Sequence, residues 1–263
     1  MYGDFETETS HKYLQTVIRA LNEPICILGG WAVFYQVNKN FKEAQARDYL
    51  GSRDIDLGFH MDKTWSEKKL KESPLAKSLD ILRRELGFNS VSFRLYKELD
   101  TETGEVVRKG KVVPSYQRFM MYVDPIVDFI PPNFKNLFGF NPIDEPLLKL
   151  VFENHEHRTE LEEFDKKLLL PNSEILVATK INSIHGRDKK DKKLKDLCDL
   201  FALLWYSDEK HTNIKIKVKK ILSKNDIKEK LSIITDEEIQ AISPLVGHTE
   251  DEIKRVVVDW DVA

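Results

Sequence analysis

The apolar and polar positions of the first half of the chain predict a small mixed sheet with helices packed on it. Residues 11–21 carry Leu, Val and Ile at helical spacing, and this helix must end near Pro24. Residues 24–28 form a short apolar run typical of a buried strand, and Gly29-Gly30 ends it where a helix from Trp31 to Val37 can begin. Further segments follow along the chain: strands at 54–57, 91–96 and 120–130, helices at 63–70 and 74–86, and a turn at 101–105 that predicts a hairpin through 106–113.

The second half has the periodicity of helices. Ser173 is the predicted N-cap of a helix over 174–184 that stops at Gly186, and 189–206 carries a long apolar stripe. Helices are also predicted at 214–222, 226–233 and 250–260. In the first half of the chain, a polar spacer at 36–50 separates the helix that begins at Trp31 from the strand at 54–57. This spacer predicts a break at Asn38-Lys39-Asn40 and a short helix from Lys42 to Tyr49. The fold class is therefore α/β (α+β), with the sheet in residues 1–142 and a mainly helical domain in residues 143–263.

The composition limits the possible functions of the protein but does not identify one. The 263 residues include 41 basic and 44 acidic ones, so affinity for nucleic acid requires a local patch and does not follow from net charge. Cys26 and Cys198 lie in apolar segments and are expected to be small buried residues, not a disulfide or metal ligands. The absence of a signal pattern and of a long apolar run predicts a cytoplasmic protein with no membrane partner.

The segment from Ile25 to Asp56 predicts an anion site followed by a metal site. Gly29 and Gly30 let backbone N–H groups approach an anion at a helix N-terminus. Strand alternation places Asp54 and Asp56 on one face, roughly 6–7 Å apart along the strand, which suits a pair of divalent ions about 4 Å apart. Each feature alone has a plainer explanation, a tight turn for the glycines and a solvated edge for the acids.

A third acid makes the combination more specific. Asp128 stands in an apolar run, residues 125–131, where an uncompensated carboxylate is costly unless a cation neutralises it. Asp124 lies on the same face by alternation, but Pro125 argues against continuous pairing there. Asp128 is therefore the predicted third acid.

These residues resemble a known family. Gly29-Gly30, Asp54-Ile55-Asp56 and Asp128 together are similar to the nucleotidyltransferase superfamily related to DNA polymerase beta. The long spacer before Ser52-Arg53 resembles the AbiEii-type branch, many of whose members are toxins of type IV toxin-antitoxin systems. A second block matches that branch and brings the similarity to about the first four-fifths of the chain; it comprises residues 170–176, Lys180, Arg187, Lys195-Asp196 and Asp199-Leu200.

The resemblance implies a metal-dependent enzyme that moves a nucleoside monophosphate from a nucleoside triphosphate to an acceptor hydroxyl. Residues 1–142 would be the catalytic domain, and residues 143–263 would help to bind nucleotide and acceptor. The implied ligands of two Mg²⁺ ions, or of Mn²⁺, are Asp54, Asp56 and Asp128. The implied nucleotide-binding residues are Gly29, Gly30, Ser52, Arg53, Lys180 and Asp196.

The acceptor and the role of Lys180 stay open at this point. RNA, tRNA in particular, is the leading acceptor by resemblance, with a cognate antitoxin protein as a further partner. The alternatives are an antibiotic-type small-molecule acceptor, and a catalytically silent nucleotide-binding, RNA-binding or protein-interaction module. Lys180 meets the triphosphate, forms an ion pair with Asp196 or Asp199, or does both, with the acid orienting the lysine. The basic cluster, six Lys and Arg residues within 187–195, is either a solvated helix start or a phosphate-binding surface.

Overall fold

The computed structural model describes residues 3–108, 110 and 112–260, which fold into two compact units. The sheet unit consists of the described parts of Tyr2–Trp31 and Gly51–Leu170. The helical unit consists of Ala32–Leu50 and the described part of Pro171–Ala263. This division differs from the predicted boundary after residue 142, because two strands within 158–171 belong to the sheet and residues 32–50 belong to the helical unit.

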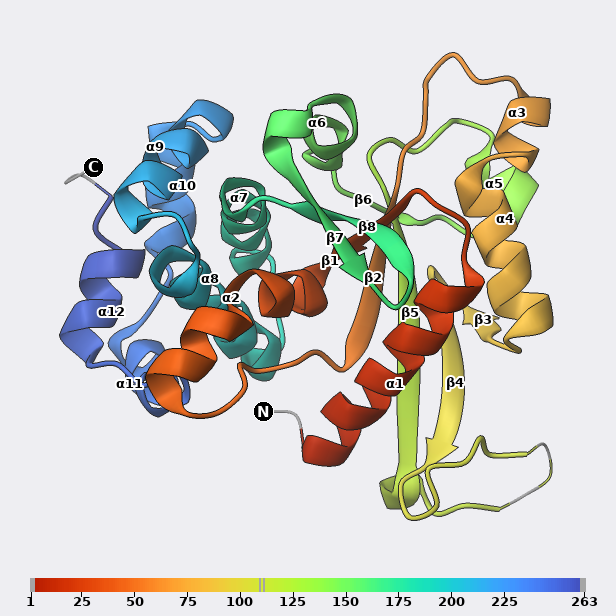
Figure 1. Ribbon diagram of the computed structural model, residues 1–263, viewed down its shortest axis with the longest axis horizontal. Coiled ribbons are helices and arrows are strands. Elements are labelled where there is room, and N and C mark those ends of the chain that lie inside the picture. Colours follow the sequence, from red (N-terminus) through yellow and green to blue (C-terminus); the bar gives the residue numbers. More distant parts are fainter. Residues whose placement is uncertain (1–2, 109, 111, 261–263) are drawn as a thin grey trace. The chain divides into compact units, whose positions relative to one another are not determined.

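Within the described residues, eight strands form one mixed sheet in the order β3-β4-β5-β2-β1-β8-β7, with β6 also pairing with β5 (Figure 1). The strands are β1 Ile25–Leu28, β2 Asp54–Phe59, β3 Asn89–Val91, β4 Arg94–Asp100, β5 Arg118–Val127, β6 Ile143–Asp144, β7 Arg158–Glu163 and β8 Lys166–Pro171. The central strands β1 and β2 are antiparallel, whereas β2 and β5 are parallel. The predicted mixed sheet is confirmed, and β6, β7 and β8 are additions to it.

The strand β5 continues through Pro125, so the expected interruption there is wrong. Leu57 of β2 pairs with Pro125, and the ladder runs on to Phe59 and Val127. The Asp128 N–H donates to the Phe59 carbonyl, so by alternation the nitrogen of Pro125 faces the other edge of β5. On that edge, pairing with β4 ends at Val123 and pairing with β6 begins at Ile126. The missing N–H of the proline therefore costs no ladder hydrogen bond.

One long helix, α1, and several short helices accompany the strands of the sheet unit. They are α1 Asp4–Ala20, α3 Glu67–Lys71, α4 Pro74–Asp80 with its π-helical continuation η1 Ile81–Glu85, α5 Phe134–Phe138, α6 Leu148–Glu153, and the 3-10 turns η2 Ser115–Gln117 and η3 His155–His157. The helix predicted at 11–21 thus begins earlier, at Asp4. The strand predicted at 91–96 is interrupted by a tight turn at residues 92 and 93, because Val91 ends β3 and Arg94 begins β4. The predicted turn at 101–105 is present, because the Asp100 N–H donates to the Glu105 carbonyl and Val106 makes an antiparallel bridge to Leu99. The predicted hairpin goes no further in the described residues: β4 pairs with β5, and residues 109 and 111 lie outside the described residues.

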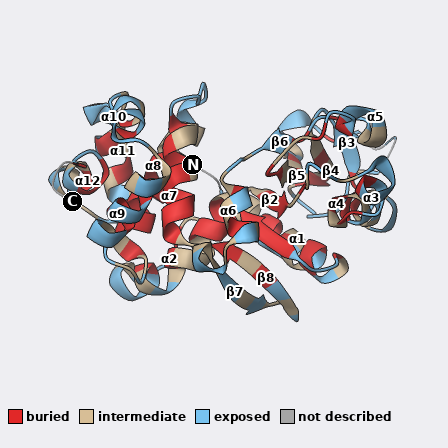
Figure 2. Ribbon diagram, turned by 90° about the horizontal axis from the view of Figure 1, so that it is seen from above, coloured by how far each residue is buried: buried red, intermediate tan, exposed pale blue. Residues whose placement is uncertain are grey.

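The helical unit is organised around two largely buried helices. These are α7 Ser173–Ile184 and α8 Lys190–Tyr206, whose buried faces are red in Figure 2. Around them lie α9 His211–Ile221, α10 Lys224–Leu231, α11 Asp236–Val246 and α12 Glu250–Val257. The predicted helices are confirmed with shifted ends, and the N-cap of α7 is Asn172 instead of Ser173. Both cysteines are buried and free, as expected.

The spacer 36–50 is mostly helix, so the predicted break at Asn38-Lys39-Asn40 is wrong. Helix α2, Gly29–Gln45, runs through it and begins in the sheet unit. The amide of Asn40 donates to the Tyr206 carbonyl at 2.8 Å, and Asn38 accepts from the Tyr49 N–H at 2.7 Å. Because these side chains bond to other segments of the helical unit, they do not compete with the helical backbone.

Candidate functional site

A row of carboxylates crosses the centre of the sheet in the sheet unit. Asp56 on β2 is in register with Leu28 on one side and with Asp124 on the other. Neighbouring strands lie about 4.8 Å apart, and in-register residues of parallel strands project from the same face. Asp54 shares that face with Asp56, while Ile55 and Leu57 are fully buried on the opposite one. The row therefore contains three carboxylates within two strands.

Arg94, the first residue of β4, joins this row. Its Nε donates to Asp124 Oδ1 at 2.7 Å, and its Nη2 lies 2.6 Å from both Asp124 Oδ2 and Asp54 Oδ2. The guanidinium also stacks 3.9 Å from the centroid of the Tyr122 ring. Burial lowers the pKa of Arg94, but Asp124 and Asp54 raise it by more, so the net pKa is above its usual value and the side chain stays charged.

Gly29 makes room for Asp56. Its φ is +59°, and a Cβ added there would overlap with the Asp56 carboxylate. Only glycine combines that backbone conformation with that clearance. The strand β1 ends here and α2 begins, so the predicted glycine cradle lies directly against an acid of the row. The helix N-terminus, which favours anions, and the Asp56 carboxylate, which can bind a cation, therefore lie side by side at Gly29.

Asp128 lies outside the row, so the structure does not bring the predicted third acid together with Asp54 and Asp56. It follows the end of β5, four residues beyond Asp124, or about 13 Å along an extended strand. Its carboxylate accepts from the Met61 N–H at 2.7 Å and lies 2.5 Å from Nδ1 of His60. The side chain of Asp128 is 2% exposed and that of His60 is 35% exposed. The buried carboxylate is thus compensated by a backbone N–H and an imidazole.

Ser52 and Arg53 contact the rest of the sheet unit. The hydroxyl of Ser52 donates to the Asp54 carbonyl at 2.9 Å, which holds the start of β2. Arg53 lies 3.4 Å from Glu6 and its guanidinium covers the Phe119 ring. These contacts position the backbone next to Asp54, and the nucleotide-binding role expected of both residues remains a prediction.

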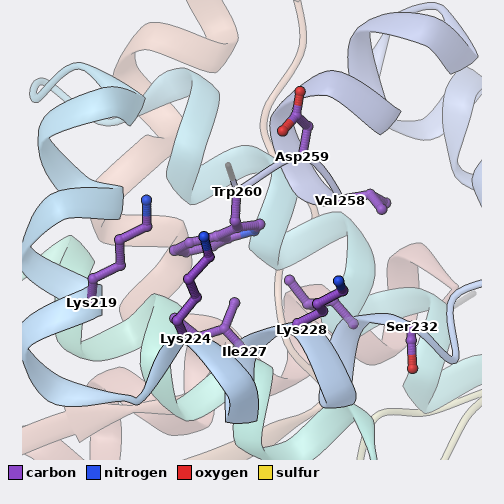
Figure 3. A pocket seen from close by; sticks show the side chains of 9 residues that line it. Lys219, Lys224, Ile227, Lys228, Ser232, Val258, Asp259 and Trp260 are labelled. Atoms are coloured by element: carbon purple, nitrogen blue, oxygen red, sulfur yellow. The ribbon is translucent and has the colours of Figure 1, made fainter. Parts of the chain in front are cut away.

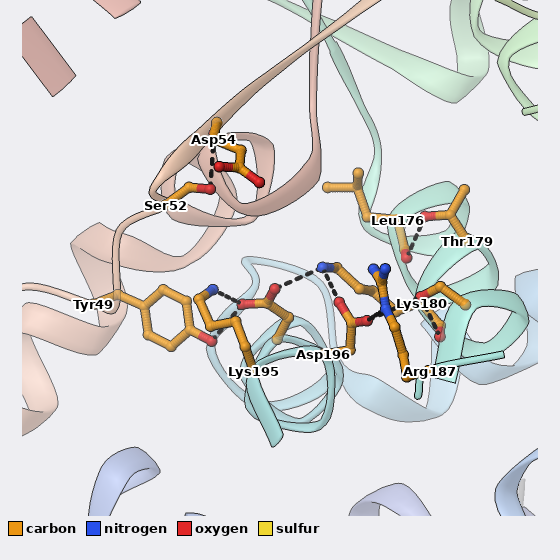
Figure 4. A network of polar contacts seen from close by, with 11 residues as sticks. Tyr49, Ser52, Asp54, Leu176, Thr179, Lys180, Arg187, Lys195 and Asp196 are labelled. Atoms are coloured by element: carbon orange, nitrogen blue, oxygen red, sulfur yellow. Dashed lines mark hydrogen bonds and ion pairs between the residues drawn. The ribbon is translucent and has the colours of Figure 1, made fainter. Parts of the chain in front are cut away.

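Lys180 and Asp196 belong to a buried ionic network in the helical unit (Figure 4). Lys180 Nζ lies 2.6 Å from Asp196 and 2.7 Å from Asp199, and Arg187 Nε lies 2.6 Å from Asp196. The ion-pair alternative for Lys180 is therefore present in the structure. Its contact with a triphosphate remains a prediction.

The network extends through Asp199. This carboxylate is completely buried, pairs with Lys195 and accepts from the Tyr49 hydroxyl at 2.8 Å. Burial raises the pKa of Asp196, but Lys180 and Arg187 lower it by more, to about 2. Burial lowers the pKa of Lys180, but Asp196 and Asp199 raise it above its usual value. Lys180 and Asp196 are thus both charged at neutral pH.

The same contacts show which residues of the basic cluster form ion pairs within the protein. Arg187 and Lys195 are in the network, and Lys193 Nζ lies 2.7 Å from Glu238. Lys189 and Lys190 are exposed at the start of α8. At least three of the six residues therefore form intramolecular ion pairs, and the surface available to phosphates is smaller than the sequence suggests.

The carboxylate row has the donor chemistry of a Mg²⁺ site. Carboxylate oxygens, few in number and completed by phosphates, are the ligands this ion prefers, and the space at Gly29 keeps Asp56 beside a helix N-terminus. No ready-made cluster of three metal-ligating His, Cys, Asp or Glu side chains occurs among the described residues. In the row, the arginine already bonds to two of the three carboxylates. The residues fit a divalent cation at Asp54 and Asp56.

A pocket of about 310 Å³ lies in the helical unit (Figure 3). Ile227, Leu231 and Trp260 give it apolar walls, and the lysines among its lining residues are Lys219, Lys224 and Lys228. None of the acids of the row lines it.

Among the helices that the structure describes, none has the combination of length and apolar composition needed to cross a membrane.

Two residues of the row were missed by sequence reasoning. For Asp124 the sequence holds a signal, since alternation places it on the same face as Asp128, but Pro125 argues against it. Arg94 carried none, since only the register of β4 with β5 places it beside Asp124.

The solved structures to which the chain is similar include the crystal structure of an antigenic nucleotidyltransferase-like protein from Paracoccidioides brasiliensis. The two chains are 16% identical, the alignment covers 94% of this chain and 93% of that one, and the TM-score is 0.42. No protein-family model matches the chain, and no curated protein matches it. The chemistry of the site therefore follows from its own residues.

Proposed function

We propose that the protein is a nucleotidyltransferase, which moves a nucleoside monophosphate from a nucleoside triphosphate to an acceptor hydroxyl. The observation that carries the proposal is the carboxylate row, Asp54 and Asp56 on β2 with Asp124 in register on β5, beside Gly29 at the N-terminus of α2. The motif resemblance of Gly29-Gly30 and Asp54-Ile55-Asp56 supports it.

In this proposal the chain's own residues bind and orient the reactants. Asp54 and Asp56 hold divalent metal, Mg²⁺ or Mn²⁺, and Asp124 replaces Asp128 as the third acid of the site. Backbone N–H groups at Gly29 and Gly30 donate to the triphosphate. When bound, the metal lowers the pKa of the attacking hydroxyl and neutralises charge on the leaving pyrophosphate. The rigid sheet keeps the carboxylates in place, so little reorganisation accompanies the reaction.

The acceptor we propose is RNA, tRNA in particular, and the biological role that of a toxin with a cognate antitoxin. Support comes from the similarity of residues 170–200 and of Ser52-Arg53 to AbiEii-type enzymes. The exposed Lys189 and Lys190 offer positive charge for phosphates. A neighbouring gene for a small antitoxin would agree with this role, and an isolated gene would argue against it.

The test is label transfer from each α-³²P-labelled nucleoside triphosphate to total cellular RNA in the presence of Mg²⁺. We expect label on one RNA size class with the wild-type protein, and a loss of orders of magnitude with the double variant Asp54→Ala, Asp56→Ala. Asp144→Ala, an exposed acid on β6, is the matched control and should retain activity.

Each outcome tests a different part of the proposal: the role of the carboxylate row, the RNA acceptor, or the enzyme activity itself. Label that persists in the double variant would refute the role of the carboxylate row. Triphosphate and Mg²⁺ binding without RNA labelling would overturn the RNA acceptor and point to a small molecule or a protein. No Mg²⁺-dependent binding of any triphosphate would overturn the enzyme proposal itself.

A further inference from the structure

We infer that Arg94 takes the place of one of the two metal ions expected at such a site, so that the protein binds a single divalent cation, at Asp54 and Asp56. This inference rests on the proposed function and concerns the same carboxylates. It assigns Arg94 as a positioning residue, a fixed cation that holds Asp124.

The geometry of the guanidinium supports this assignment. Arg94 binds Asp124 with two parallel N–H···O contacts, 2.7 Å and 2.6 Å long, so each oxygen of that carboxylate accepts from the fork. Such bidentate pairs are the strongest and most directional of the ionic hydrogen bonds. A metal ion that ligated Asp124 would have to displace the fork. The two oxygens of Asp124 are thus used by a resident cation.

The surroundings hold Arg94 in that position. Its side chain is 18% exposed, the Asp124 side chain is 6% exposed, and the face of the guanidinium packs on Tyr122. Nη2 also reaches Asp54 Oδ2 at 2.6 Å. Removing the arginine would leave Asp124 as a buried charge without this partner, which is unfavourable. Arg94 is therefore held in place in the folded protein, unlike an arginine that moves freely on the surface.

Charge counting agrees with one ion in the free protein. Three carboxylates contribute three negative charges and Arg94 contributes one positive charge, which leaves two negative charges for the row. A single divalent cation neutralises this remainder. A second one would bring two excess positive charges into a site with little exposure to water, before any triphosphate is bound.

The experiment is a count of Mn²⁺ ions bound to the full chain, by isothermal titration calorimetry and by the electron paramagnetic resonance of free Mn²⁺. For the wild type without nucleotide we expect one ion per chain. For Arg94→Met we expect the count to rise to two, because Asp124 becomes available. Arg118→Met removes another arginine of the same sheet, paired with Glu98, and should stay at one.

A second variant keeps the test decisive should Arg94→Met fail to fold. Arg94→Lys keeps the positive charge but cannot form the fork, and is expected to gain a second, weaker Mn²⁺ site. Two ions bound to the wild type, or a count that stays at one in each folded Arg94 variant, would overturn the inference. Those results leave the proposed function intact, whereas no Mn²⁺ binding by the wild type or by any Arg94 variant would overturn the proposed function as well.

Discussion

Gly29 determines where the Asp56 carboxylate can lie. We expect Gly29→Ala to displace Asp56, because its Cβ would overlap with the carboxylate and its φ of +59° strains any other residue. The variant should lose about 1–3 kcal/mol of unfolding free energy and bind Mn²⁺ more weakly than the wild type. Urea denaturation and calorimetry measure the two effects.

Gly87 is the matched control for that substitution. Its φ is +66° but nothing lies within 4 Å of an added Cβ. Gly87→Ala should therefore show the backbone strain alone, with unchanged Mn²⁺ affinity. Equal Mn²⁺ binding by both alanine variants would show that the clearance at Gly29 does not matter.

Lys215 is a buried lysine whose ammonium contacts backbone carbonyls. Nζ donates to the Asp259 carbonyl at 2.6 Å and lies over the Trp260 ring. Burial lowers its pKa to about 8, opposed by Asp259 and assisted by Lys219. In the unfolded chain the lysine holds its proton to about pH 10.4, so between these values the unfolded state binds more protons than the folded state. Stability should rise with pH in this window.

The measurement is the unfolding free energy at pH 8 and at pH 9.5. The wild type should gain about 2 kcal/mol relative to Lys215→Met over this interval. Parallel pH dependence of the two proteins would show that Lys215 is charged in the folded state throughout.

At the scale of elements, the ionic network joins α7 to α8. Asp196 on α8 receives Lys180 from α7 and Arg187 from the segment between the helices. Breaking a buried pair by removing one partner costs about 3–5 kcal/mol. We expect this loss for Asp196→Ala in urea denaturation. Glu153→Ala, which removes an exposed partner of Lys149 on α6, should cost less than about 1 kcal/mol.

The network also predicts that the free energy of unfolding decreases at acid pH, which gives the curve of stability against pH an acid limb. The pKa of Asp196 is about 2 in the folded protein against an ordinary value of 3.8, so the unfolded state binds more protons between these values. Its stabilising contribution is present above pH 4 and is lost as the pH falls toward 2, by about 2 kcal/mol. Asp196→Asn should flatten this limb, and an unchanged acid limb in that variant would contradict the lowered pKa.

The helices differ in how well local sequence patterns predict them. The long apolar stripe of α8 placed that helix within a residue of its observed start. Helix α11 has no counterpart among the predicted helices, and it contains Pro244, a residue that usually disfavours a helix interior. A capping box between Thr235 and Glu238 marks its beginning and was the available signal.

At the scale of the whole molecule, ligand binding should stabilise the fold. A ligand that binds only the folded state at 100 times its Kd adds about 2.7 kcal/mol. We expect a non-hydrolysable triphosphate with Mg²⁺ to raise the melting temperature of the wild type but not of the Asp54→Ala, Asp56→Ala variant. Mg²⁺ alone and triphosphate alone are the controls, and a shift that survives in the variant would place the binding elsewhere.

The sequence by itself determined the local parts of this protein. The apolar run before Gly29 defines β1, and the two-residue period of a strand places Asp54 and Asp56 on one face. These features follow from backbone geometry over a few residues and need no distant partner.

Only the tertiary structure decided which residues meet in the carboxylate row. Asp124 stands beside Asp56, and Arg94 beside Asp124, because strands 30 to 70 residues apart in the chain pair in one particular register. That register is set by the packing of the whole sheet, which local periodicity does not report. The same holds for Asn40, whose helix is stabilised by contacts with Tyr206 that no pattern within 36–50 reveals.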